Sequence, residues 1–373
     1  MAESEQVITV EDVTADSVGR SPRALSEIIL SQLEALKTHH RAVLESDKAE
    51  AIHKMRVTTR RAQAAIDLLG REPKVRAAKR LLRNWRRRLS LVRNYDVFLM
   101  LLEKESQARR AAHREQFQLV TTMLQKRRAH RAAKVKEYFE KIDISSIPSK
   151  LGMSATAPQN NTGEGAAADE TNAIEESLVS TIDSSPLFDR SRIAGYAAKR
   201  LDQRLAEFYA LAAAAHPTTD PAELHQLRIA AKRVRYLLEV VTEMGYGDAT
   251  RALAWLKTLQ DRIGDWHDLH ALEEEIIEVV SRRRFMKEHL SESSRMLQVA
   301  AHLQKKKEAL VAKLFPVRAP RTLALTAQRI ARALRRDSLR AGAGVKRTGR
   351  FKNETPQPQN NNPRSNYNFT SHN

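Results

Sequence analysis

The sequence has 373 residues, with 64 Lys and Arg against 45 Asp and Glu, a formal net charge of +19 and no cysteine. The lack of cysteine excludes disulfides, thiolate metal sites and a cysteine nucleophile. Only 12 glycines and 12 prolines occur, which disfavours a β-rich fold with many tight turns and favours long helices. No apolar run reaches the roughly 18 residues that span a bilayer, and the acidic start of the chain lacks the features of a signal peptide. We therefore expect an all-α, cytoplasmic protein whose partner is a polyanion.

Charge and sequence complexity divide the chain into segments. Residues 1–21 are acidic and are expected to be disordered. Residues 22–144 and 187–315 are two helical blocks with amphipathic patterns. Between them, residues 145–186 are acidic and rich in Ser, Thr and Gly, as is typical of a flexible linker. Residues 316–373 form a basic tail, which we expect to be helical in part and then disordered.

Two further segments predict long basic helices. From Tyr95 onward the pattern predicts one continuous helix with a solvated basic face. In the tail, residues 329–340 (RIARALRRDSLR) predict a basic amphipathic helix. Such a helix could bind nucleic acid or an acidic membrane surface.

The two helical blocks contain an internal repeat. The segment from His53, HKMRVTTRRAQAAIDLL, aligns without gaps with the segment from His225, HQLRIAAKRVRYLLEVV, at an offset of 172 residues. The same offset pairs Asp96 with Asp268. A constant offset over this length indicates a duplicated helical unit, so we expect two halves with pseudo-twofold symmetry.

Each repeat places cations on one face of a helix, at positions i, i+3 and i+7. Cations this close repel each other, so they need a bound anion or nearby carboxylates as compensation. Asp96 and Asp268 are the candidate carboxylates, either as helix caps or as side chains that orient the arginines. The cationic face of the second copy extends to Arg235, where the first copy has Gln63. The basic residues of the two motifs are His53, Arg56, Arg60 and Arg61, and His225, Arg228, Lys232, Arg233 and Arg235.

Two more groups of cations extend the predicted anion-binding track. One follows Pro73 in the first block, and the other lies on the first helix of the second block. Arginine suits a row of phosphates because its planar guanidinium donates two parallel hydrogen bonds. The alternative for these groups is an ordinary solvated surface. Their residues are Lys79, Arg80, Arg83 and Arg87, and Lys199, Arg200 and Arg204.

The repeated H-x-x-R-x-x-x-[KR]-R helix, with the aspartate that follows it in each copy, resembles the CHAD family, the conserved-histidine α-helical domain. The resemblance covers about residues 22–315, with the acidic linker inserted between the halves. It implies two four-helix bundles related by a pseudo-twofold axis, with a basic central surface that binds inorganic polyphosphate. It also implies a role at polyphosphate granules or beside polyphosphate-metabolising enzymes.

Two alternatives remain open at this point. A nucleic-acid-binding protein could use the same cations, although few aromatic residues are placed for base stacking. A metal-dependent phosphohydrolase could use His225, His267 and Asp268, but the further ligands that such chemistry needs have no clear counterpart. Neither a glycine-rich phosphate loop nor a serine elbow occurs in the sequence. We therefore predict an anion-binding protein that is not an enzyme and uses neither a cofactor nor a metal.

Overall fold

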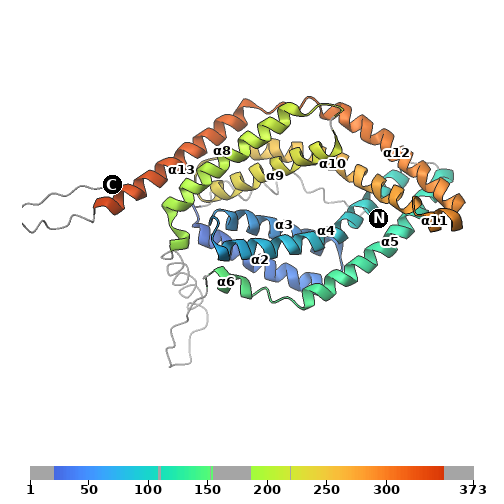
Figure 1. Ribbon diagram of the computed structural model, residues 1–373, viewed down its shortest axis with the longest axis horizontal. Coiled ribbons are helices and arrows are strands. Elements are labelled where there is room, and N and C mark those ends of the chain that lie inside the picture. The colour runs from blue at the N-terminus through green and yellow to red at the C-terminus, as the bar shows by residue number, and fades with distance from the viewer. Residues whose placement is uncertain (1–20, 108–110, 152, 154–185, 219, 348–373) are drawn as a thin grey trace, which may run out of the picture.

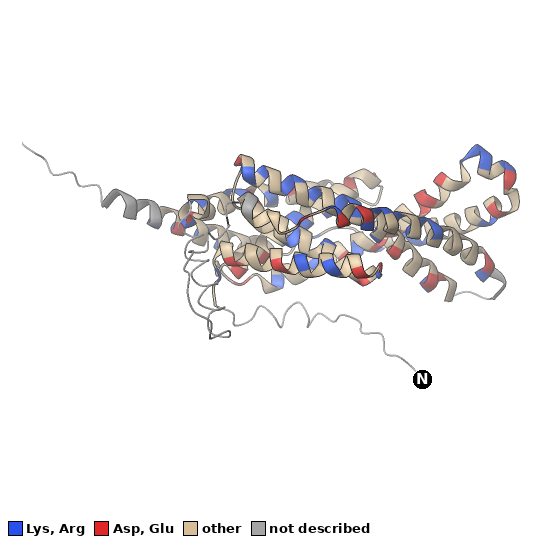
Figure 2. Ribbon diagram, turned by 90° about the horizontal axis from the view of Figure 1, so that it is seen from below, with Lys and Arg blue, Asp and Glu red and all other residues tan. Residues whose placement is uncertain are grey.

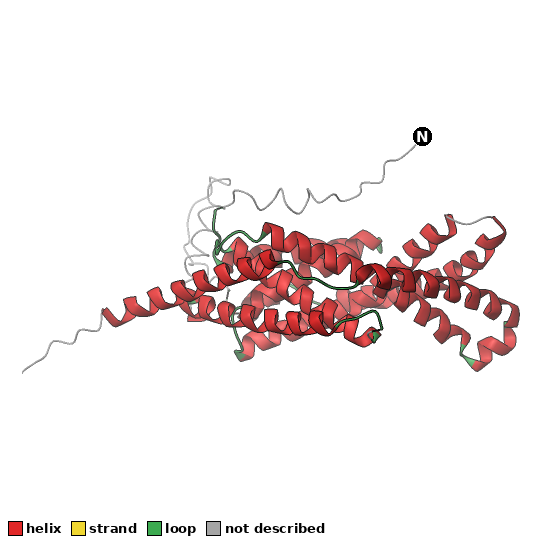
Figure 3. Ribbon diagram, turned by 90° about the horizontal axis from the view of Figure 1, so that it is seen from above, coloured by secondary structure: helices red, strands yellow, loops and turns green. Residues whose placement is uncertain are grey.

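The computed structural model describes residues 21–107, 111–151, 153, 186–218 and 220–347. Within these residues every regular element is a helix (Figures 1 and 3). The all-α prediction is therefore confirmed for the described part of the chain. The predicted disorder at 1–20, in most of the linker and at the end of the tail falls outside the described residues.

Long helices dominate the fold, and short ones occur only beside the connections between them. In chain order they are α2 (Leu25–Glu45), α3 (Ala49–Asp67), α4 (Pro73–Gln107), α5 (Ala111–Glu140), α6 (Ser146–Leu151), the 3-10 helix η1 (Pro186–Phe188), α8 (Arg190–Ala214), α9 (Pro221–Glu243), α10 (Thr250–Val280), α11 (Arg283–Glu288), α12 (Leu290–Leu314) and α13 (Arg321–Arg347).

The second repeated helix, α9, begins and ends at residues suited to those positions. Asp220 caps it by accepting a hydrogen bond of 2.7 Å from the backbone N–H of Ala222, and Pro221 occupies the first turn. After its last turn, Gly245 adopts a φ of +87°, which favours glycine. A Cβ at Gly245 would also lie 2.8 Å from Pro22, so this helix end is packed against the start of the chain's first helical block.

Helices of the two sequence halves pack against each other along the length of the molecule. α3 contacts α9, α4 contacts α10, and α5 contacts α12, so each pair joins matching parts of the repeat (Figure 1). Two hydrophobic clusters result, a large one that includes α3 and α9 and a smaller one built by α4, α5, α10 and α12. Both clusters contain residues of both halves, so the halves share their cores.

The long helix predicted from Tyr95 is wrong. Tyr95 lies inside α4, which ends at Gln107, and α5 packs back against α4. Nε of Arg128 on α5 lies 2.6 Å from Oδ1 of Asp96 on α4. The reversal has no sequence signal of the usual kind, because neither glycine nor proline occurs between residues 100 and 115.

α13 is packed against the helical core although it lies in the predicted tail. It runs along α8, where Ser191 donates a hydrogen bond of 2.8 Å to the carbonyl of Ser338 and Arg190 lies 2.9 Å from Asp337. The apolar face of α13 is covered in this way and is not available to a membrane or a nucleic acid. Its residues in the large hydrophobic cluster are Leu323, Ala327, Ile330, Ala331 and Leu334.

Candidate anion-binding site

Basic side chains from three helices converge where the two halves meet. α3 and α9 contribute predicted cations. α4 adds Arg86, from the basic stretch after Pro73 that the sequence predicts to extend the track, and Arg93, which the sequence did not indicate. Figure 2 shows Lys and Arg along the helices in the middle of the molecule, with acidic residues scattered among them. We call the converging residues the central cluster: Arg56, Arg60, Arg86, Arg93, Arg228 and Lys232.

Burial and mutual repulsion act strongly on the charges of the central cluster. Burial, followed by the charges of Arg60 and Arg228, lowers the pKa of Arg56 to about 9. Burial, followed by the charges of Arg228 and Arg60, lowers the pKa of Lys232 to about 6. In both cases the protein disfavours the protonated form. Burial is the larger cause, and the neighbouring cations of the cluster add to it by repelling the protonated form.

Neutral groups supply several of the contacts that hold the cluster in place. Nη1 of Arg60 donates to the hydroxyl of Tyr236 at 3.2 Å, and Nη1 of Arg86 donates to Oε1 of Gln63 at 3.2 Å. Gln63 is the residue at which the first copy departs from the second, and this contact gives it a positioning role. Such contacts orient the guanidinium groups without neutralising them.

Two guanidinium nitrogens of the central cluster lack hydrogen-bond partners in the described part of the chain. These are Nε of Arg56 and Nε of Arg228, and both atoms are buried. A buried donor without an acceptor costs about 1–3 kcal/mol. A bound oxyanion would supply acceptors and negative charge at the same time.

Asp268 is the carboxylate that forms an ion pair with Arg228 of the second repeat. Its Oδ1 is 3.8 Å from Nη2 of Arg228, and burial raises its pKa although Arg228 and Lys232 oppose this. Asp268 lies in the middle of α10, so it orients a cation and does not cap a helix. Arg228 also lies over Gly264, where a Cβ would come 3.4 Å from Nη2. The small residue at 264 thus leaves room for the guanidinium.

Asp96, the matching residue of the first copy, has a different partner. It is buried in the middle of α4 and pairs with Arg128 of α5. It is therefore not a helix cap either. Its ion-pair partner Arg128 lies outside the central cluster, while its charge also opposes the lowering of the pKa of Arg93 by burial.

The repeated histidines flank the cations and are neutral around pH 7. Removal of water and the charge of Arg93 lower the pKa of His53 to about 4, and burial also lowers the pKa of His225. The ring of His225 lies 4.8 Å from the ring of His267, whose pKa burial and Arg228 lower to about 3. His267 of α10 therefore lies at the site, although the repeat places a tyrosine, Tyr95, at the matching position of the first copy.

Three predicted track residues surround an acid instead of joining the central cluster. Lys79, Arg200 and Arg204 all form ion pairs with Asp67, which is 6% exposed at the end of α3. Together these cations lower the pKa of Asp67, although its burial opposes them. We call this group the Asp67 cluster. Its cations neutralise a buried carboxylate, so they have less charge to offer to a ligand.

The remaining predicted residues lie on the outside or have acidic partners. Arg233 lies 2.7 Å from Glu207, and Arg235 lies 3.0 Å from Glu239. Arg83 and Arg87 are exposed on α4 and close enough to Arg86 to lower its pKa, after the larger effect of burial. These two arginines extend the central cluster outward. Arg61, Arg80 and Lys199 are exposed.

Metal ligation has no support in the described residues. No group of three or more His, Cys, Asp or Glu side chains there is arranged to hold a metal ion. His225, His267 and Asp268, the residues of the phosphohydrolase alternative, lie next to Arg228 and Lys232. These positive charges oppose a cation and favour an anion.

Fold and site together define a helical protein with a cationic centre between two repeated halves. Residues 27–276 match the family model of the CHAD domain, and the chain belongs to this family. No curated protein matches the sequence. Among the described helices, none is long and apolar enough to cross a lipid bilayer.

A solved structure supports the assignment of the fold, and a second one is reported beside it. The crystal structure of the CHAD domain from the plant Ricinus communis is 22% identical, with a TM-score of 0.53, and the match covers 80% of this chain and 94% of that one. PptA from Streptomyces chartreusis is 15% identical, with a TM-score of 0.47, over 86% of this chain and all of that one. The first comparison shows that the helical CHAD fold is shared.

Proposed function

We propose that the central cluster binds inorganic polyphosphate. The CHAD domain is linked to polyphosphate binding, and the observation that carries the proposal is the convergence of six cations with too few carboxylates. A linear chain of charged phosphates suits a surface to which α3, α4 and α9 all contribute cations. The protein holds the chain and does not cleave it, because the site offers donors and no arrangement of metal-ligating acids.

The guanidinium groups form the main contacts in this proposal. Arg56 and Arg228 use their unpartnered Nε atoms and their terminal nitrogens to donate to phosphate oxygens. Arg83 and Arg87 continue the track along α4. The bound negative charge also raises the pKa of Lys232 and of the neighbouring histidines, so these groups gain protons as the chain binds.

The arrangement of the halves and the cell role belong to the same proposal. We infer that residues 22–315 form two four-helix bundles related by a pseudo-twofold axis and that the polyphosphate chain crosses their seam. The protein would then act in the cytoplasm, at polyphosphate granules or by controlling access of polyphosphate-metabolising enzymes.

Charge reversal at the centre tests the proposal directly. The double variant Arg56→Glu/Arg228→Glu is titrated with long-chain polyphosphate at about 150 mM salt, where weak screened contacts are reduced. Loss of two cations and gain of two anions should weaken binding at least about 100-fold, since each charged contact contributes about 1.5–3 kcal/mol. Helix content measured by circular dichroism should stay unchanged.

A matched control carries the same change of charge away from the site. Arg251 and Arg262 are exposed on α10 and form no ion pair with a described residue. Arg251→Glu/Arg262→Glu should bind within a few-fold of the unchanged protein. Equal losses in both variants, or equal competition by single-stranded DNA, would contradict a dedicated polyphosphate site and favour general polyanion binding.

A further inference from the structure

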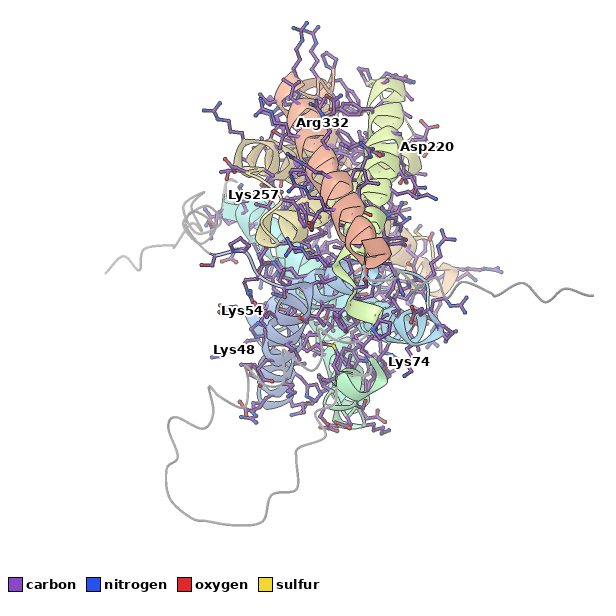
Figure 4. All side chains as sticks on the ribbon, turned by 90° about the vertical axis from the view of Figure 1, so that its left-hand side faces the viewer. Lys48, Lys54, Lys74, Asp220, Lys257 and Arg332 are labelled. Atoms are coloured by element: carbon purple, nitrogen blue, oxygen red, sulfur yellow. The ribbon has the colours of Figure 1, made fainter. Side chains whose placement is uncertain are left out.

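The outer face of α13 is a basic surface that the proposed polyphosphate site does not use. α13 lies beyond residues 27–276, which match the family model, and Figure 4 shows it as an outer helix with Arg332 labelled on it. Between residues 316 and 347 the sequence has eight arginines, one lysine and one acid, Asp337. Asp337 is occupied by Arg190 and by the hydroxyl of Tyr246.

The exposed residues of this face follow one line along the helix. At 3.6 residues per turn they lie within an arc of about 80°, over a length of about 27 Å. The arc is opposite the residues that pack against α8, so both faces can be occupied at once. We call the line the α13 stripe: Arg321, Leu325, Arg329, Arg332, Arg336 and Leu339.

The charges of the α13 stripe are uncompensated. None of its four arginines forms an ion pair with a carboxylate in the described part of the chain, whereas Arg335, which points to one side, pairs with Asp202. Neighbouring cations on one helix face repel each other. The stripe therefore gains stability from an external anionic surface.

Two leucines distinguish this surface from an ordinary basic helix. Leu325 is 51% exposed and Leu339 is 75% exposed, and they lie among the arginines near the two ends of the stripe. Contact with a phosphate backbone buries little apolar surface of a leucine. Entry into the acyl boundary of a lipid layer removes that surface from water and lowers the free energy. Aromatic residues, which would stack on bases, are lacking in α13.

We propose that the α13 stripe docks the protein on an anionic phospholipid surface. The arginines bind lipid phosphates and carboxylates, and the two leucines enter the interface beside them. The central cluster lies between α3, α4, α9 and α10, on other helices, so a docked protein can still bind its anion there. Docking is peripheral, because the larger apolar face of α13 remains packed on α8.

The test uses the full chain and vesicles of phosphatidylcholine with about one-third phosphatidylserine at about 150 mM salt. The unchanged protein should sediment with these vesicles and not with pure phosphatidylcholine. Each basic residue near such a surface contributes about 1 kcal/mol. Arg329→Glu/Arg332→Glu/Arg336→Glu should therefore weaken vesicle binding at least about 100-fold, while polyphosphate binding stays within a few-fold.

Matched controls test whether vesicle binding depends on the positions of these residues or only on net charge and exposed apolar surface. Arg251→Glu/Arg262→Glu/Arg283→Glu changes the net charge equally on α10 and α11 and should retain vesicle binding. Leu325→Asn/Leu339→Asn should weaken binding about tenfold or more. In the leucine control, Leu290→Asn/Leu297→Asn on α12, where both leucines are also exposed, binding should be unchanged.

Several results would overturn the proposal. Equal losses in the stripe and control variants would mean that only net charge matters. Unchanged binding after the two stripe leucines are replaced would remove the lipid argument. Binding of duplex DNA that depends on the three arginines, without vesicle binding, would assign the stripe to nucleic acid instead. Failure of the unchanged protein to bind polyphosphate, with vesicle binding retained, would instead count against the central cluster and not against the stripe.

Discussion

Lys232 links anion binding to protonation at the scale of a single residue. In the empty site its pKa of about 6 leaves the amine mostly neutral near pH 7.5. A bound phosphate chain raises this pKa, because negative charge favours the ammonium form. The complex then holds more protons than the free protein between the two pKa values. The affinity for polyphosphate should therefore rise as the pH falls from the alkaline range towards pH 6.

Calorimetry can measure this proton uptake. Titration with polyphosphate in two buffers of different ionisation enthalpy should show a net uptake of protons at pH 7.5. Lys232→Met should remove most of the uptake, while Lys257→Met, on the neighbouring helix α10, should leave it unchanged. Uptake that persists in Lys232→Met would mean that the histidines or the ligand itself take up the protons.

Residue spacing predicted only part of the site. The repeated motif identified Arg56, Arg60, Arg228 and Lys232, because a shared period places such residues on one face of each helix. It could not identify Arg93, since the choice of α4 arginines that turn inward depends on how α4 crosses α3 and α10. Histidine and arginine roles as polyphosphate ligands stay predictions.

Helix packing also determines which cations form ion pairs with the protein's own carboxylates. Residue type alone assigned Lys79, Arg200 and Arg204 to the anion-binding track. In the structure Lys79 lies on α4, the two arginines lie on α8, and their side chains meet at the end of α3. All three form ion pairs with Asp67, an acid in a strongly basic segment of the sequence. The partner of a cation on another helix cannot be read from local spacing.

The Asp67 cluster should be a strong determinant of stability at the scale of helix packing. Asp67→Asn leaves three cations around a neutral amide, and removal of one partner from a buried charge group costs about 3–5 kcal/mol. Urea denaturation at pH 7 should show that the free energy of unfolding falls by about this amount. Asp202→Asn, which removes a half-exposed partner of Arg335, should cost less than about 1 kcal/mol.

The sign of the pH dependence gives a second check on Asp67. Its pKa is lowered in the folded protein, so its contribution is present above the unfolded pKa and is lost as the pH falls through the folded value. The gap in stability between the unchanged protein and Asp67→Asn should therefore narrow in acid. A constant gap from neutral to strongly acidic pH would contradict the ion-pair explanation.

At the scale of the whole molecule, the shared hydrophobic clusters predict that the two halves form one cooperative unit. Both hydrophobic clusters contain residues of both halves, and α13 adds to the larger cluster. The repeat in the sequence predicts two related halves, and their pseudo-twofold arrangement stays a prediction. It did not show that they would share their cores, because long-range contacts between amphipathic helices leave no periodic signal of their own.

Cooperativity and binding can be tested together by calorimetric unfolding. Since both hydrophobic clusters contain residues of both halves, the described helices should unfold in a single transition. Polyphosphate that bridges the halves binds only the folded protein, so a concentration of about 100 times the Kd should add about 2.7 kcal/mol and raise the whole transition. Arg56→Glu/Arg228→Glu should unfold in one transition that polyphosphate does not shift. Two separate transitions, only one of which responds to polyphosphate, would show that the halves are independent and that the ligand binds to one of them.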